Sequence, residues 1–167
     1  VTATTVTSDS SQMISGSSSA ATTIQTYGTS SFGGEDFISV SRIEVRSSVP
    51  VLGTLTVVNV FSTPFLSGPK EICGGKVYNL PATPGTQTTT PPGVSSASTA
   101  LARKLEILSA NEQVTVPAGT FATYHTKATA SDGTITEVWT DRPTGLIAKQ
   151  ISTGTNGTTT YQATSLR

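Results

Sequence analysis

Between residues 112 and 166, short β-rich runs alternate with turn-forming residues. The turn signals are PAG at 117–119, DG at 132–133, RPTG at 142–145 and NG at 156–157. Asp-Gly and Asn-Gly favour tight hairpins because these residues adopt positive φ at little cost. The runs between them are rich in Thr, Val, Ile and aromatic residues, which suit a pleated backbone. The pattern predicts a consecutive antiparallel meander over residues 112–166.

The hairpin at Asp132-Gly133 has two possible registers. A two-residue loop pairs Thr126 with Trp139 and places Tyr124 and Glu137 on the face of Trp139. We favour this register because it separates an apolar face from a polar one. It leaves the Glu137 carboxylate on the inner face, where it needs a hydrogen-bond donor, the margin of the sheet or a cavity.

A three-residue loop of residues 131–133 gives the other register. It pairs Lys127 with Glu137 and His125 with Trp139. Because side chains alternate along a strand, this slip by one residue changes which side chains face inward.

Composition supports a sheet protein. Ser and Thr make up about a third of the 167 residues, while 35% are hydrophobic and 12% charged. At 17.1 kDa the chain is long enough for one domain with a real core. We therefore predict a mainly β fold, a single domain over residues 1–167 with antiparallel sheet in an open half-barrel or β-sandwich-like arrangement.

The N-terminal half is less regular. Residues 8–21 are dominated by Ser, which predicts a flexible segment. Residues 81–98 are rich in Pro and Thr and form either a linker between two domains or a long loop inside one, and we favour the loop. The run at 51–61 is the best candidate for a central strand. Residues 100–108 fit a helix or a strand equally well.

Few residues could carry chemistry. Cys73 is the only cysteine, so an internal disulfide and a thiolate zinc cage are excluded, and we expect a buried or turn-flanking thiol. His125 is the only imidazole. We expect no catalytic residues, metal site or cofactor, and we assign Asp132 and Asp141 to turns. An imidazole in a cleft, bonded to two carboxylates, would argue against this expectation.

The stretches "EQVTVPAGTFATYHT" and "EVWTDRPTGLIAKQ" resemble the C-terminal signature of a group of uncharacterised exported bacterial proteins. Those proteins are similar to the lipoprotein carriers LolA and LolB, which have an open antiparallel half-barrel around an apolar cavity. The resemblance covers residues 112–152. It implies an exported protein of the periplasm, outer envelope or extracellular space.

Two functions follow as expectations. In the first, a non-enzymatic envelope protein holds a lipid or a lipoprotein acyl chain in a curved sheet, lined by Tyr124, Ile135, Glu137, Trp139 and Leu146. In the second, a structural or recognition protein of the cell surface has a filled core and no ligand. We expect a monomer. We also expect no transmembrane segment, because no apolar run is long enough to span a bilayer. A formal net charge of zero makes nucleic acid an unfavourable partner.

Overall fold

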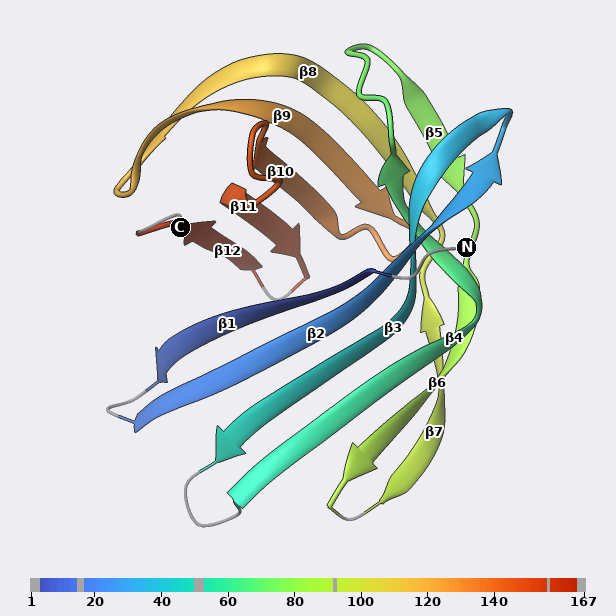
Figure 1. The fold of residues 1–167 in the computed structure, drawn as a ribbon, viewed down its shortest axis with the longest axis vertical. Helices are drawn as coiled ribbons and strands as arrows, with labels where there is room; N and C mark the ends of the chain where they lie inside the picture. The colour runs from blue at the N-terminus through green and yellow to red at the C-terminus, as the bar shows by residue number, and fades with distance from the viewer. Residues whose placement is uncertain (1–3, 15–16, 50–52, 92, 156, 165–167) are drawn as a thin grey trace. The chain divides into compact units, whose positions relative to one another are not determined.

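The computed structural model describes residues 4–14, 17–49, 53–91, 93–155 and 157–164. These residues form twelve strands and no helix, and every strand pair is antiparallel (Figure 1). The predicted mainly β, antiparallel fold is confirmed. In this described part of the chain there is no helix long and apolar enough to cross a membrane.

The chain divides into two compact units, where the sequence suggests one domain. Unit 1 comprises Val1–Lys70 and Ala82–Ala100, and unit 2 comprises Glu71–Pro81 and Leu101–Arg167. Each unit contains one six-stranded sheet with two open edges. Each is described by itself below.

The sheet of unit 1 has the strand order β1-β2-β3-β4-β6-β7 (Figure 1). Strand β4 pairs with β3 on one side and with β6 on the other, which confirms a central position for the run that ends at Phe61. The strands are β1 (Thr4–Ile14), β2 (Ser17–Phe32), β3 (Glu35–Val49), β4 (Gly53–Pro69), β6 (Thr83–Thr90) and β7 (Val94–Ala100).

Both segments predicted to be irregular contribute strands. Most of residues 8–21 belongs to the β1–β2 hairpin, and residues 81–98 include β6 and most of β7. Backbone pairing needs no apolar side chain, and Thr favours the pleated conformation. Fast amide exchange in these segments stays a prediction.

Strand β3 carries buried apolar side chains in its first half and a charged group in its second half. Phe37 and Val40 are almost fully buried, and the Phe37 ring meets Phe32 edge-on at 5.6 Å between centroids. Glu44 accepts hydrogen bonds from Arg42 at 2.8 Å and from Arg46 at 2.6 Å. These three residues share one face because they are two positions apart.

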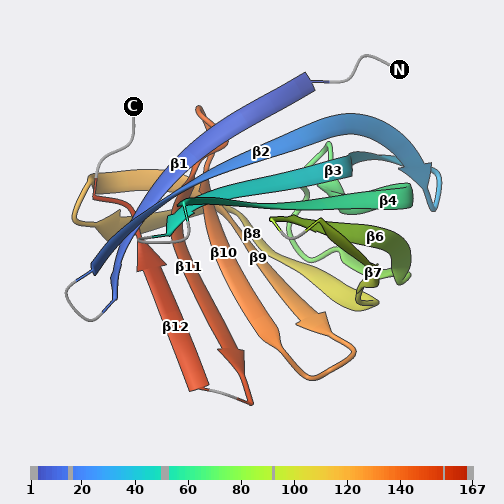
Figure 2. The same ribbon diagram turned by 90° about the horizontal axis from the view of Figure 1, so that it is seen from below.

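The sheet of unit 2 has the strand order β12-β11-β10-β9-β8-β5. Figure 2 shows β12, β11, β10 and β9 side by side. Consecutive antiparallel pairing of its last five strands confirms the predicted meander. Residues 103–108 belong to a strand, which settles the choice between helix and strand there. The strands are β5 (Val77–Leu80), β8 (Arg103–Val116), β9 (Gly119–Ala130), β10 (Ile135–Asp141), β11 (Ile147–Gly154) and β12 (Gly157–Gln162).

The favoured register of the β9–β10 hairpin is wrong. Trp139 pairs with His125 and Glu137 pairs with Lys127, as a three-residue loop of residues 131–133 requires. A two-residue type I′ turn needs positive φ at both central residues, whereas the three-residue loop needs it only at its last residue. Gly133 supplies that conformation with φ of 84°.

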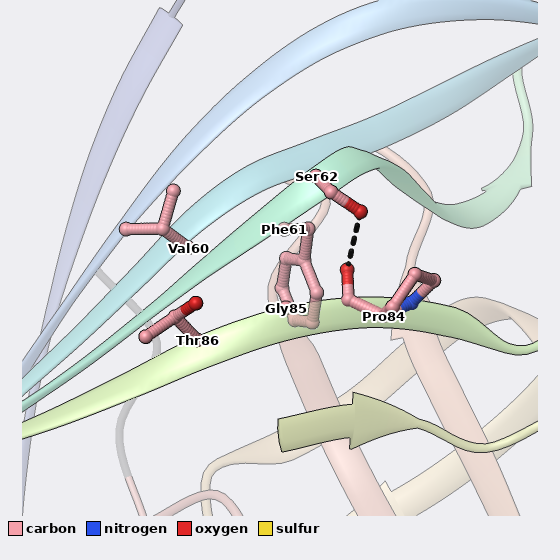
Figure 3. Close-up of a pocket in the computed structure, with 6 residues that line it drawn as sticks. All are labelled: Val60, Phe61, Ser62, Pro84, Gly85 and Thr86. Atoms are coloured by element: carbon pink, nitrogen blue, oxygen red, sulfur yellow. Dashed lines mark hydrogen bonds between the residues drawn. The ribbon is translucent and has the colours of Figure 1, made fainter. Parts of the chain in front are cut away.

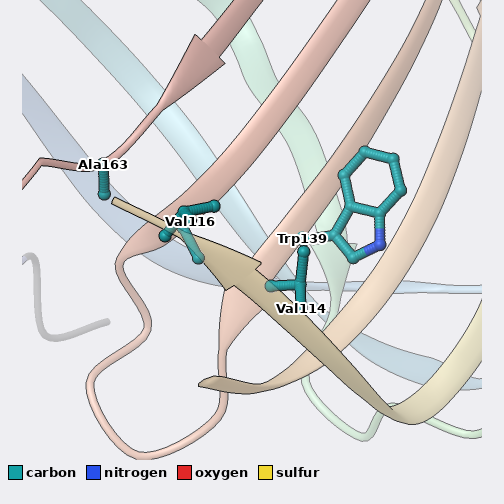
Figure 4. Close-up of a cluster of buried hydrophobic side chains, with 5 residues drawn as sticks. Val114, Val116, Trp139 and Ala163 are labelled. Carbon is teal, nitrogen blue, oxygen red and sulfur yellow. The ribbon is translucent and has the colours of Figure 1, made fainter. Parts of the chain in front are cut away.

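A small apolar cluster lies where the meander turns back at residues 117–118. Trp139 and Val114 lie side by side in it, with Val116 and Ala163 farther along the sheet (Figure 4). Ala118 N–H donates to the carbonyl of Ala163 at 3.0 Å, which ties the end of the chain's last described segment to this turn. Burying each large apolar side chain stabilises the fold by about 1.5–3 kcal/mol.

Candidate functional site

The most concentrated group of polar side chains in unit 2 surrounds His125, and we call it the His125 cluster. Its members are Glu112 on β8, His125 on β9, Glu137 and Trp139 on β10, and Lys149 on β11. The Nδ1 atom of His125 lies 2.8 Å from Oε2 of Glu112, and its Nε2 atom lies 3.2 Å from Oε2 of Glu137. The imidazole therefore joins two carboxylates from the neighbouring strands.

The strand registers bring these residues together. His125, Trp139 and Lys149 form one row across β9, β10 and β11. Glu137 is the diagonal neighbour of His125 on the same face, within reach of a long side chain. Irregularities in the β8–β9 pairing end at Glu112, which pairs with Thr123, two residues before His125. Such bulges change the direction of a strand and of its side chains.

Trp139 is at the centre of the row. Its ring stacks on the imidazole of His125, with centroids 4.0 Å apart and planes at 21°. Lys149 Nζ lies 4.7 Å from the centroid of the same ring, a cation–π contact. The indole Nε1–H donates to Oε1 of Glu112 at 3.0 Å. Trp139 is thus in contact with three charged or titratable side chains while it is only 6% exposed.

The Glu112 carboxylate has an altered acidity. The hydrogen bond from the Trp139 indole lowers the pKa of Glu112 below its ordinary value of 4.5, and the hydrogen bond from His125 adds to this effect against the opposing effect of desolvation. Donors to a carboxylate favour its ionised form. Glu112 is therefore an anion over the whole neutral range.

An imidazole beside carboxylates can act in acid–base chemistry, but a nucleophile or substrate must reach its nitrogens. Here both nitrogens face carboxylates. Cys73 is exposed beside the Gly74-Gly75 turn, which fits the predicted turn-flanking thiol. Among the residues that the structure describes, no group of three or more His, Cys, Asp or Glu side chains is arranged to hold a metal ion.

The structure does not gather the five predicted lining residues around one space. Glu137 and Trp139 belong to the His125 cluster. Tyr124 points to the opposite face of the sheet from His125, and the guanidinium of Arg142 lies 5.5 Å from its ring centroid. Ile135 is half-buried at the start of β10, and Leu146 is exposed in the turn before β11.

Asp132 lies in the β9–β10 turn, and Asp141 is the last residue of β10, where its side chain binds the turn that follows. Oδ1 of Asp132 accepts a hydrogen bond from the backbone N–H of Thr134 at 2.9 Å, and this bond lowers the pKa of Asp132. Oδ2 of Asp141 accepts bonds from the N–H of Thr144 at 3.1 Å and from its hydroxyl at 2.6 Å. These bonds stabilise the turns on either side of β10.

The sequence pattern did not lead us to Glu112 and Lys149 as members of the cluster. A signal for Glu112 was present: a two-residue turn at 117–118 pairs Val116 with Gly119 and, counting outward, Glu112 with Thr123. Since alternate residues share a face, this register puts Glu112 on the face of His125. Lys149 follows from the β10–β11 register, which pairs it with Trp139, together with the β9–β10 register, which pairs Trp139 with His125.

Unit 1 has a separate hollow of about 380 Å³ on β4 and β6. Its lining is Val60, Phe61, Ser62, Pro84, Gly85 and Thr86, and the hydroxyl of Ser62 donates to the carbonyl of Pro84 at 2.9 Å (Figure 3). A Cβ atom on Gly85 would lie 2.6 Å from the carbonyl oxygen of Val60 and 3.1 Å from the Phe61 ring. The close approach of β4 to β6 therefore requires glycine at this position.

Comparison of the chain with protein-family models, with curated proteins and with solved structures found no match.

Proposed function

We propose that this protein is a non-enzymatic, exported protein of the bacterial cell envelope with a structural or recognition role. The observation that carries the proposal is the position of Trp139. The Trp139 side chain was expected to line an apolar cavity. It is instead in contact with His125, Glu112 and Lys149 of the same chain. A site filled by its own side chains leaves the exposed, Thr-rich strands as the surfaces available for contacts.

Export and an envelope location rest on the likeness of residues 112–152 to exported bacterial proteins and on the Ser- and Thr-rich, charge-poor composition. His125, the only imidazole, is bonded to two carboxylates, which is part of the arrangement that we expected to argue for catalysis. The proposal that the protein is not an enzyme rests on the direction of these contacts. Because each ring nitrogen of His125 faces a carboxylate, neither nitrogen is directed at a substrate.

A second candidate is a carrier of an apolar ligand such as a lipid acyl chain, and the hollow in unit 1 favours it. Val60, Phe61 and Pro84 supply apolar surface there, and Val60 is 45% exposed. The volume of about 380 Å³ is within the range of small-molecule sites. In this candidate the ligand lies on β4 and β6 of unit 1, whereas the residues that the sequence suggested belong to unit 2.

The test is fractionation of the native host followed by native mass spectrometry and lipid extraction of the purified chain. We expect the protein in the envelope or outside the cell, at the mass of the chain alone. A cytoplasmic location would overturn the proposal. A stoichiometric lipid that is lost in Phe61→Ala would replace it with the carrier.

Catalysis is tested in the same preparation with chromogenic ester and glycoside substrates. We expect no turnover above that of the His125→Ala variant. Turnover by the wild type that His125→Ala abolishes would show that the protein is an enzyme.

A further inference from the structure

The hydrogen bonds of His125 require more protons than a neutral imidazole carries. A neutral imidazole has one N–H donor and one lone-pair acceptor, and an ionised carboxylate only accepts. Both ring nitrogens lie within hydrogen-bonding distance of carboxylate oxygens. With a neutral ring, one of these contacts places a lone pair against a carboxylate oxygen. Only the doubly protonated imidazolium donates to both.

We propose that Glu112, His125 and Glu137 form a proton-dependent clamp across β8, β9 and β10, closed when the imidazole carries two protons and open at Glu137 when it carries one.

Opening occurs at Glu137 because the two contacts are unequal. The distance from Nδ1 to Glu112 is 2.8 Å, whereas that from Nε2 to Glu137 is 3.2 Å. Glu112 is also held by the Trp139 indole at 3.0 Å, so its position does not depend on His125 alone. A single remaining N–H therefore stays with Glu112, and the Glu137 side chain is released.

The charges around the ring come from four strands. Glu112 on β8 and Glu137 on β10 contact it directly, and both favour a positive imidazolium. Two cations oppose a further positive charge: Lys149 on β11, over the Trp139 ring, and Lys127 on β9. Lys127 pairs in register with Glu137 on one side and with Glu106 on the other.

The consequence is a stability that depends on pH with a defined sign. The clamp adds a charge-assisted hydrogen bond in the folded state only while His125 is doubly protonated. Stability from this source is therefore present while the imidazole carries two protons and is lost when it carries one. Loss of one such bond raises the unfolding equilibrium constant by about tenfold.

The experiment uses the full chain, which has one His and one Trp. Imidazole ¹⁵N spectra of the wild type between about pH 5.5 and 8.5 identify the protonation state of His125, since this range spans ordinary imidazole titration. We expect two N–H donors at the acidic end and one at the basic end, with a change in Trp139 emission at the same midpoint. A single neutral tautomer over the whole range would overturn the proposal.

Variants test the assignment of the opening contact. Between the ends of that pH range, the unfolding constant of the wild type should rise about tenfold more than that of Glu137→Gln, which lacks the second anionic acceptor. Lys104→Gln is the control for removing a lysine from unit 2, because Lys104 pairs with Glu106 at 2.9 Å, and it should retain the wild-type pH dependence. Equal pH dependence in the wild type and Glu137→Gln would contradict the clamp. The wild-type spectra still test the clamp if a variant does not fold.

Discussion

At the scale of single residues, Trp139 does the most to organise unit 2, because it joins the apolar cluster to the charged side chains around His125. Trp139→Phe keeps an aromatic ring but removes the indole N–H. We expect a loss of about 1 kcal/mol in the free energy of unfolding, at the low end for a bond to a charged group because the Glu112 side chain is 39% exposed. Urea unfolding followed by circular dichroism measures this loss. In a Glu112→Ala background the same substitution should cost less, and an equal cost would contradict the bond.

The lowered pKa of Glu112 predicts an acid dependence. A carboxyl group whose pKa is lower in the folded state stabilises the fold above its ordinary value of 4.5, and this contribution is lost as the pH falls through the lowered value. The Glu112→Gln variant has no carboxyl group at this position, so it has no such contribution to lose on acidification. The difference in unfolding free energy between wild type and Glu112→Gln should therefore shrink on acidification from about pH 5 to 3. A difference that stays constant over this range would show that the pKa of Glu112 is not lower in the folded state than in the unfolded state.

Gly85 predicts a packing effect in unit 1. Gly85→Ala places a Cβ atom 2.6 Å from a backbone oxygen of β4, so the strand pair must shift, at a cost of about 1–3 kcal/mol. Gly68→Ala is the control, because a Cβ there would meet nothing within 4 Å. Thermal unfolding of both variants checks the prediction, and equal midpoints would contradict it.

At the scale of elements, the turns of the meander were readable from sequence because Gly, Pro and Asp leave a local signal. The β9–β10 register was not, since Asp132-Gly133 fits a loop of two residues or of three and the apolar pattern favoured the wrong one. For Glu137 the favoured register left three possibilities open, the sheet margin, a donor or a cavity; in the observed register its Oε2 atom lies 3.2 Å from Nε2 of His125. The position of His125 beside two carboxylates depends on registers at both of its neighbouring strands, so one hairpin alone could not predict it.

The β9–β10 loop predicts a substitution effect of its own. Gly133 has φ of 84°, a conformation that costs a residue with a Cβ atom about 1–2 kcal/mol. Gly133→Ala should lower the unfolding free energy by that amount, measured in urea. Gly74→Ala is the matched control in another turn of unit 2, where the nearest atom to the new Cβ is at an ordinary 3.6 Å. Equal losses in the two variants would contradict the three-residue loop.

At the scale of the whole molecule, each unit has its own sheet, and the only tryptophan lies in unit 2. Composition predicted the β class correctly. The Pro- and Thr-rich stretch at 81–98 raised the question of a linker between two domains, but it contributes β6 and most of β7 to unit 1, so it does not mark the boundary between the units. Residues 8–21 also lack apolar alternation, so the β1–β2 pairing could not be derived from their sequence.

The division predicts two unfolding transitions. Trp139 emission reports on unit 2, whereas circular dichroism reports on both sheets, so we expect different midpoints in urea. Gly85→Ala should shift the dichroism transition and leave the emission midpoint unchanged. Coincident transitions that Gly85→Ala moves together would show that the units unfold as one.

The path of the chain between the units has a consequence during translation. Strand β5 belongs to unit 2, but its partner β8 follows only after β6 and β7 of unit 1, with Leu80 paired to Arg103. At about 5–20 residues per second, a ribosome takes roughly one to five seconds to cover that separation. Over this interval the nascent β5 has no strand to pair with in its own sheet, while unit 1 receives its last strands. The strands of unit 1 are therefore all synthesised before those of unit 2 are complete, and β5 stays unpaired until β8 has been synthesised.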